Sequence, residues 1–467
     1  MHDLRKKALL ESGKTTSRKA RSRPESTRGS TTHSPVTSPG HSRPGSRANS
    51  RPGSRYASED EGFSDSEYDE TMTMSTNSAS DDAADGEPRQ SWVERLQDRI
   101  AELDDRKRSS VQGRTGLLAG YLHLIRHHFA GPQIEGSVSE IVDTLLKSIK
   151  GGGSAEERSL ALKSLTVTAL NCPAESIFEQ AFEPLKVVCH DAQDEEVKVD
   201  AIYAMAVAAI YCSGFVAAAE DLLEFLMDII ESDGNVVEAE DSGPVVAAAL
   251  QAWGFVAGQI EDLSDWSEEA MDAFIEQLQS TDIDVQTSAG SNVAFLLEVS
   301  RDQEEETGEA LNFSYNSHGL MQRLNELARG SKSISKKDRR HVRTELKDVI
   351  QSIEEGVGPG YSTVLYDEVN PRTPGNKADG RGGKHLGYRK KLRVRDDLML
   401  IDTWSLNSRA ETLRLLLGGG FGTHCVDNPH IINIFGDAEV ETLTKEALPK
   451  KSPRKASKKK GGRIQDY

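Results

Sequence analysis

The side chains best placed for chemistry in this chain are basic, and their spacing suits a phosphate backbone. Lys336, Arg339, Arg340 and Arg343 recur every three or four residues, so a helix would gather them into one basic stripe. Such a stripe can contact the phosphates of a nucleic acid. The alternative is an ordinary solvated helix face that is attracted to acidic groups elsewhere in the chain, and the sequence favours neither interpretation.

Two further basic segments lie toward the C-terminus. Residues 370–395 carry nine Lys or Arg among several glycines and predict an exposed loop. Residues 450–463 hold eight basic residues and no acidic one, which is typical of a disordered interaction tail or a nuclear import signal. The candidate nucleic-acid-binding residues of these segments are Arg389, Lys390, Lys391, Arg393, Lys450, Lys451, Arg454, Lys455, Lys458, Lys459 and Lys460.

Motifs for catalysis or for a cofactor are not recognisable. The glycine-rich run Gly418–Gly422 follows a predicted helix, whereas a phosphate-binding loop precedes one, so we expect a helix end and a turn. His424-Cys425 and Cys189-His190 are adjacent pairs without further ligands at metal-binding spacing, and we interpret them as structural. The sequence therefore predicts a protein that is not an enzyme and that uses no cofactor, metal or small-molecule substrate.

Charge is distributed very unevenly along the 467 residues, whose net charge is −18. By segment it is +10 over 1–56, −10 over 57–90, +2 over 91–134, −29 over 135–330 and +9 over 331–467. The basic ends could therefore bind nucleic acid, whereas the acidic middle could not.

The elements that must position these residues are helices. The sequences Ser91–Glu94 and Ser154–Glu157 read as capping boxes, and apolar residues recur at helical spacing up to about residue 355. The predicted helices are 92–108, 115–130, 138–150, 155–171, 175–189, 194–212, 215–232, 243–260, 267–279, 283–299, 317–330 and 336–355. From residue 138 they form pairs in which one helix is nearly uncharged and the other amphipathic, as stacked helical repeats require.

One uncharged stretch needs a separate test, because residues 201–219 have the length of a membrane span. The stretch is mostly alanine, is interrupted by Ser213-Gly214 and has no basic flank. We therefore expect a buried repeat helix and no membrane partner.

The predicted fold is all-α: an armadillo- or HEAT-like α-solenoid with a small C-terminal α+β cap and disordered basic tails. The domains are expected at 1–90 (disordered, Ser/Arg/Pro-rich and then acidic), 91–357 (solenoid), 358–440 (cap, with the basic loop 370–395) and 441–467 (disordered Lys-rich tail). Within the cap, residues 361–366 and 398–401 predict strands and residues 407–417 a helix. Serines of the N-terminal segment lie beside Arg or acidic residues and are candidate phosphorylation sites.

The four cysteines contain no CxxC pair, which suits a reducing compartment. The residues that follow Met1 form no apolar segment, so we expect no signal peptide. These features predict a cytoplasmic and nuclear protein.

Three short motifs resemble the interferon-related developmental regulator family. Residues 335–339 (Ser-Lys-Lys-Asp-Arg) and 346–349 (Leu-Lys-Asp-Val) resemble its S-K-K-D-R…F-R-D-V/I stretch, and residues 400–404 (Leu-Ile-Asp-Thr-Trp) its apolar-I-D-S/C-W. Residues 413–420, followed by His424, Asn428, Ile432 and Phe435, are similar to its helix, G-S-G turn and H…N…L…V-F segment.

That resemblance covers about residues 90–440 and implies an armadillo-like helical fold, no catalysis and a regulatory role. Members of the family are described as transcriptional co-regulators and as ribosome-associated factors that restrain translation. This chain departs from the family in two places: residues 370–395 read as an insertion, and the family's basic C-terminal extension is replaced by a Lys/Ser/Pro tail. We therefore expect a protein that binds the ribosome through rRNA phosphates and restrains translation. The alternative is a nuclear co-regulator scaffold that holds basic or chromatin-associated partners on its acidic helices.

Overall fold

The structure is a computed structural model that describes residues 91–104, 109–214, 216–330, 336–367, 384–388, 390–394, 397–436, 438 and 440–442. The chain divides into two units, Met1–Glu59 and Asp60–Tyr467, and every described residue belongs to the second. The segments 1–90 and 443–467 lie outside the described residues, so their expected disorder stays a prediction.

Most of the described chain is helical, as the sequence predicts. The α-helices are α2 (Trp92–Asp104), α3 (Val111–His127), α4 (Gly131–Ile134), α5 (Val138–Gly151), α6 (Ala155–Asn171), α7 (Glu175–Asp191), α8 (Glu195–Val207), α9 (Val216–Glu231), α10 (Gly243–Ala257), α11 (Ser267–Gln277), α12 (Ile283–Thr307), α13 (Ser317–Arg329), α14 (Lys336–Glu355), α15 (Trp404–Leu417), α16 (Phe421–Asp427) and α17 (Pro429–Ile434). The Ser91 hydroxyl accepts the Glu94 amide at 3.2 Å while the Glu94 carboxylate accepts the Ser91 amide at 2.9 Å, so this capping box is confirmed.

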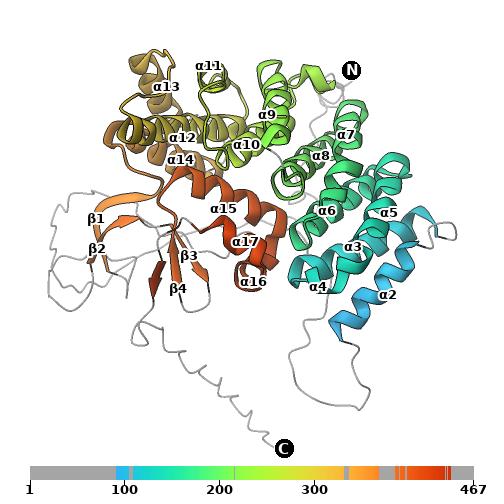
Figure 1. The fold of residues 1–467 in the computed structure, drawn as a ribbon. Helices are drawn as coiled ribbons and strands as arrows, with labels where there is room; N and C mark the ends of the chain where they lie inside the picture. Colours follow the sequence, from blue (N-terminus) through green and yellow to red (C-terminus); the bar gives the residue numbers. More distant parts are fainter. Residues whose placement is uncertain are drawn as a thin grey trace, which may run out of the picture. The chain divides into compact units, whose positions relative to one another are not determined.

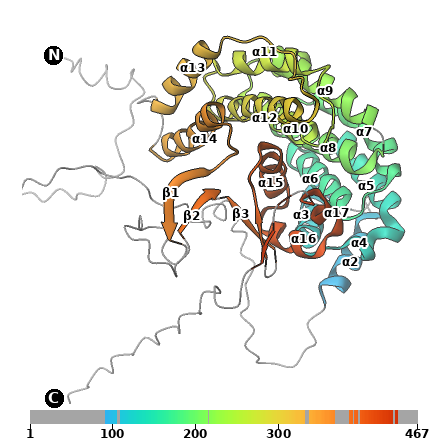
Figure 2. The ribbon, with the colours of Figure 1, turned by 60° about the vertical axis from the view of Figure 1, so that its left-hand side comes forward.

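The helices up to α14 pack in two layers. α3, α6, α8, α10, α12 and α14 contact one another in that order and form an inner row, while α5, α7, α9, α11 and α13 each pack on a helix of this row (Figures 1 and 2). α10 is buried over nearly its whole length, because its neighbours cover all of its sides, whereas α9 keeps an exposed charged face. This arrangement accounts for the alternation of uncharged and amphipathic helices. Among the helices described, none has the length and apolar character that crossing a bilayer requires.

A buried lysine joins α7, α8 and the loop after α9. Lys198 is 1% exposed, and its ammonium donates to the carbonyl oxygens of Cys189 at 3.0 Å, His190 at 2.8 Å and Val237 at 2.5 Å. The first two carbonyls belong to the last turn of α7, where helical partners run out. Lys198 therefore acts as a cap for α7 and uses all three of its donors.

Five short strands follow α14. β1 (Tyr361–Asp367) pairs antiparallel with β2 (Lys384–Tyr388), and β3 (Lys391–Val394), β4 (Asp397–Leu400) and β5 (Val440–Thr442) form an antiparallel sheet in the order β3-β4-β5. The predicted strands at 361–366 and 398–401 are confirmed as β1 and β4.

The structure differs from the predicted loop 370–395 in its second half, which forms β2 and β3. In β3 the lysines and arginines alternate with apolar residues, and Leu392 is buried, so the high basic content concealed a strand pattern. Residues 370–383 lie outside the described residues. β5 begins at Val440, the last residue of the predicted cap, and extends to Thr442, so it takes in the first two residues of the segment 441–467 that was expected to be disordered.

Residues 404–435, here named the C-terminal strap, take a different path from the predicted cap. Their helices α15, α16 and α17 contact α12, α10, α6 and α3 in the inner row (Figure 2). A cap at the C-terminal end alone is therefore not confirmed. The predicted helix 407–417 is confirmed as α15, and Gly418–Gly420 form a 3₁₀ turn that leads into α16.

The start of the C-terminal strap is held by α10, α12 and α14. The Trp404 amide donates to the Glu298 carboxylate at 2.7 Å, and the Trp404 indole N–H donates to the Ser352 hydroxyl at 2.9 Å. The Ser405 hydroxyl and the Arg409 guanidinium both donate to the Gly258 carbonyl at the end of α10. The first turn of α15 is thereby fixed against three helices.

The end of the C-terminal strap reaches α3 and α6. The His424 ring Nε2 lies 3.2 Å from the Ile125 carbonyl oxygen, and the Asn428 amide donates to the Leu170 carbonyl at 2.8 Å. Both carbonyls lie in the last turns of their helices, where helical partners run out. The strap supplies a partner for the Leu170 carbonyl and a second one for the Ile125 carbonyl, which also accepts the Asn171 side-chain amide at 3.1 Å. Gly420 lies so close to the Arg126 carbonyl that an added Cβ would fall 1.7 Å from its oxygen.

Candidate nucleic-acid interface

The predicted basic stripe lies on α14. Residues 336–343 are helical, Arg343 is exposed, and Val342, Leu346 and Val349 are buried among the α12 and α13 contacts. Lys336, Arg339 and Arg340 have side chains outside the described residues, so their positions come from the helix backbone alone. The helix therefore supports the spacing argument, while contact with phosphates remains a prediction.

Lys390 has a structural role that the sequence did not reveal. Its ammonium donates to the Asn407 side-chain oxygen at 2.9 Å and lies 3.6 Å from the Glu345 carboxylate, and the side chain is only 26% exposed. The Lys390 carbonyl also accepts the Ile401 amide at 2.9 Å. This lysine joins the residues before β3 to α14 and α15, so little of its charge remains for a nucleic acid.

The other predicted residues are brought together only in part. Lys391 is half-buried at the start of β3, and Arg393 lies in the same strand with a side chain outside the described residues. The remaining predicted residues lie outside the described residues altogether: Arg389, Lys450, Lys451, Arg454, Lys455, Lys458, Lys459 and Lys460.

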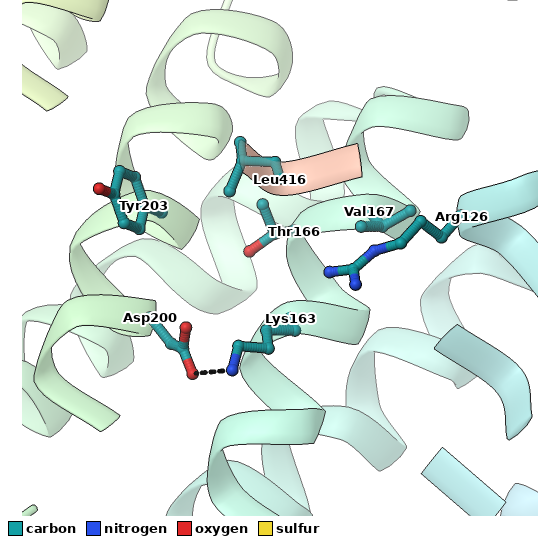
Figure 3. A pocket seen from close by; sticks show the side chains of 7 residues that line it. All are labelled: Arg126, Lys163, Thr166, Val167, Asp200, Tyr203 and Leu416. Carbon is teal, nitrogen blue, oxygen red and sulfur yellow. Dashed lines mark ion pairs between the residues drawn. The ribbon is translucent and has the colours of Figure 1, made fainter. Parts of the chain in front are cut away.

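Among the described residues, two hollows along the inner row have polar side chains in their lining. The first is lined by Arg126, Lys163, Thr166, Val167, Asp200, Tyr203 and Leu416 and encloses about 10 Å³, which is room for one water molecule (Figure 3). Lys163 lies 3.5 Å from the Asp200 carboxylate, and the Ser159 hydroxyl donates to that carboxylate at 2.6 Å. Burial raises the pKa of Asp200 to about 6. The group is an interhelical polar contact between α6 and α8.

The second hollow, of about 230 Å³, lies where α15 meets α10 and α12. Glu298 lines it and is 8% exposed, with the Trp404 and Ser405 amides as its partners. Burial, reinforced by the neighbouring Asp302, raises the pKa of Glu298 to about 8. This carboxyl is thus a proton-binding group at the first turn of the C-terminal strap. Nothing in the sequence around Glu298 pointed to this group, because its burial depends on a helix more than a hundred residues away.

Substituting Glu298→Gln tests this group through the pH dependence of stability. The folded chain holds a proton here between pH about 4.5 and 8 that the unfolded chain has released, so wild-type stability decreases with rising pH across that window. Each unit of pKa shift corresponds to about 1.4 kcal/mol, so the variant should gain stability over wild type by a few kcal/mol as the pH rises to 8. The measurement is the urea midpoint across this pH range, with Glu304→Gln, an exposed position of the same helix, as control. Parallel pH profiles for wild type and Glu298→Gln would contradict the assignment.

In the two histidine–cysteine pairs, Cys189, His424 and Cys425 are buried, whereas His190 is exposed and its ring lies 3.0 Å from the Asp191 carboxylate. His424 is fully buried with the carbonyl partner described above, and burial lowers its pKa. All four cysteines are free. In the part of the chain that the structure describes, no group of three or more His, Cys, Asp or Glu side chains is arranged to hold a metal ion.

The chain is similar in sequence to proteins of fungi and mammals. An uncharacterized protein of Schizosaccharomyces pombe is 26% identical over 364 residues, which are 74% of each chain. Interferon-related developmental regulator 1 of Sus scrofa and that of Homo sapiens are each 22% identical over 310 residues, 63% of this chain and 61% of theirs. The chain thus spans about three fifths of the length of these mammalian relatives.

The family model for the interferon-related developmental regulator matches residues 66–354. The match extends over more than half of the chain and includes the described helices from α2 to α13 and nearly all of α14. It ends before the strands and the C-terminal strap. Together with the predicted motifs, this shows that the chain belongs to the interferon-related developmental regulator family.

Proposed function

We propose that this chain is a non-enzymatic regulator that binds ribosomal RNA through its basic C-terminal segments and thereby restrains translation. The observation that carries the proposal is the separation of charge. Between Val199 and Ser300 there is no lysine or arginine, whereas residues 450–463 contain eight basic residues and no acidic one. RNA phosphates would be repelled by the middle of the chain and attracted to its end. Membership of a family of named regulators supports the regulatory role.

The proposed fold type is an armadillo- or HEAT-like α-solenoid. Its support is the regular pairing of inner-row and outer-layer helices from α5/α6 to α13/α14. A stack of this kind offers long surfaces for macromolecular partners, as a regulator without catalysis needs. We propose that the protein acts in the cytoplasm and the nucleus, since its tail also suits nuclear import.

Neutralising the tail tests the RNA contact. A full-length variant in which the eight Lys and Arg of residues 450–463 are replaced by Gln should sediment poorly with ribosomes at physiological salt. The measured quantity is the slope of log affinity against log salt concentration. If about five of these residues contact phosphates, this slope should be steeper in the wild type than in the variant by about 3.5 to 4.5. Lys390→Gln is the control, because its ammonium already binds Glu345 and Asn407. Equal binding and equal slopes for wild type and the tail variant would eliminate the tail as the contact.

A nuclear co-regulator scaffold is the second candidate, and the acidic outer layer favours it. Partial burial and then the neighbouring Glu269, Asp228 and Glu276 raise the pKa of Glu231, so carboxylates of α9 and α11 repel one another. Such a surface attracts basic proteins such as histones. Cell fractionation separates the candidates, because a nuclear steady state with no ribosome co-sedimentation supports the scaffold and contradicts the first proposal.

A further inference from the structure

A second group of basic side chains lies on α2 and α3, the first two described helices, at the N-terminal end of the inner row. Trp92, Arg95 and Arg99 of α2 lie on the side of that helix that borders α3, and His123, His127 and His128 lie at the C-terminal end of α3 and its cap. Arg95, Arg99 and His123 are exposed, and the other three side chains are half-buried. These six residues are named the α2–α3 patch. None of them belongs to the predicted nucleic-acid-binding set.

The ring geometry of the α2–α3 patch brings three histidines together. His123 and His127 have ring centroids 4.3 Å apart, and His128 stacks on the Trp92 indole at 4.6 Å with an interplanar angle of 13°. The His127 ring Nδ1 lies 3.0 Å from the His123 carbonyl oxygen, which can only accept, so Nδ1 carries a proton and donates. Stacking on an indole also suits a protonated His128 ring.

The charged groups that act on these rings are mainly positive. Burial lowers the pKa of His123, and His127, His128, Arg95 and Arg126 lower it further. Burial also lowers the pKa of His128, and the charges of His127 and Arg95 lower it further. The groups that act on His123 and His128 in the described residues include no carboxylate.

Other titratable groups near the patch lie on α2 and α16. Glu102 of α2 pairs with Arg99 at 2.7 Å, and Glu94 and Asp98 lie on the same helix. On α16, burial lowers the pKa of His424, and the charge of His127 lowers it further. The Asp427 carboxylate acts on His424 in the opposite direction. Arg99 is thus partly neutralised, whereas the charged groups that lower the pKa of His123 and His128 are all positive.

We propose that the α2–α3 patch binds RNA phosphates, and that acidification strengthens this contact by protonating His123 and His128. The missing anion would be supplied by phosphate groups, which favour the protonated rings. Over residues 135–330 the chain is strongly acidic, so this surface offers RNA a contact distant in sequence from the C-terminal tail. The inference rests on the proposed function for its partner class, RNA, and adds a separate surface to it.

The experiment measures binding of a fluorescein-labelled single-stranded RNA to full-length protein by anisotropy, across salt and between about pH 5.5 and 7.5. Arg95→Gln/Arg99→Gln should weaken binding roughly tenfold and reduce the salt slope by up to about 1.4, the value for two phosphate contacts on a single strand. His123→Gln should leave binding at the upper pH nearly unchanged and reduce the gain on acidification. The control Lys147→Gln/Lys150→Gln removes the same charge from exposed positions of α5 and should retain binding and slope.

Three outcomes would overturn the inference. The first is an unchanged affinity in Arg95→Gln/Arg99→Gln, and the second is an equal loss in the α5 control, which would mean that net charge alone matters. The third is tighter binding of poly-glutamate or of anionic lipid vesicles than of RNA, because the patch would then serve an acidic protein or a membrane surface. The tail variant is measured in parallel, so a defect in the tail variant alone would leave the proposed function standing and remove only the α2–α3 contact.

Discussion

Gly420→Ala is expected to destabilise the protein by roughly 3 kcal/mol, at the upper end for overpacking substitutions. The new Cβ would lie 1.7 Å from the Arg126 carbonyl oxygen, and backbone atoms cannot move aside as the end of a flexible side chain can. Since Gly420 has φ −87° and ψ −8°, alanine adopts its conformation without strain. The expected loss therefore reports the contact between α16 and α3, together with the His424 and Asn428 hydrogen bonds that depend on it.

Gly422→Ala is the matched control, two residues away in α16. An added Cβ there meets nothing within 4 Å, and alanine favours a helix over glycine by up to about 1 kcal/mol, so this variant should be as stable as wild type or more stable. The measurements are urea unfolding and hydrogen exchange of the amides of residues 421–436. If Gly420→Ala matched Gly422→Ala in both, the close approach of the C-terminal strap to α3 would be wrong.

Lys198→Met is expected to cost about 3 kcal/mol, because it removes the only side-chain donor described for three carbonyls while keeping a side chain of similar length. The Cys189 and His190 carbonyls would be left in the last turn of α7 without this cap, and Val237 would lose its link to α8. Relief from burying the ammonium offsets part of the loss, since burial lowers the pKa of Lys198.

The comparison for this prediction is Lys186→Met. The Lys186 ammonium lies 2.6 Å from the half-exposed Asp221 carboxylate, a type of ion pair that contributes about 1 kcal/mol or less. Urea midpoints of the two variants should therefore differ clearly, with Lys198→Met the lower. A midpoint for Lys198→Met at or above that of Lys186→Met would show that the three carbonyl contacts contribute little.

The longer helices could be predicted because each carries its own local signal, whereas the short helices α4, α16 and α17 were missed. The Ser154 cap and the apolar spacing of α6 are local, and the predicted span 155–171 agrees with the structure. The antiparallel pairing of β2 with β1 and of β3 with β4 was concealed, since basic residues outnumber apolar ones in the stretch that forms β2 and β3, and strand pairing depends on residues outside it.

For the candidate site, the sequence could predict which residues are charged but not which of these charges are already paired in the fold. Composition identifies lysines and arginines, but whether a cation is already bound depends on residues that folding brings near. Lys390 illustrates this, because Glu345 is distant in sequence and Asn407 follows a strand pair. The histidines of the α2–α3 patch were recognisable as residues on a helix, whereas their proximity to Arg95 required the packing of α2 on α3.

The C-terminal strap has a consequence for how the chain matures during synthesis. The ribosome releases α3, α6 and α10 long before residues 404–435 exist, since synthesis proceeds at roughly 5–20 residues per second and N-terminal parts fold first. During that interval the carbonyls of Leu170 and Gly258 lack their partners in the strap and must bind water, and each helix of the inner row is held only by its neighbours. Residues 404–435 therefore complete the final geometry. A prematurely terminated product would keep its earlier helices while lacking the C-terminal strap that contacts α3, α6, α10 and α12.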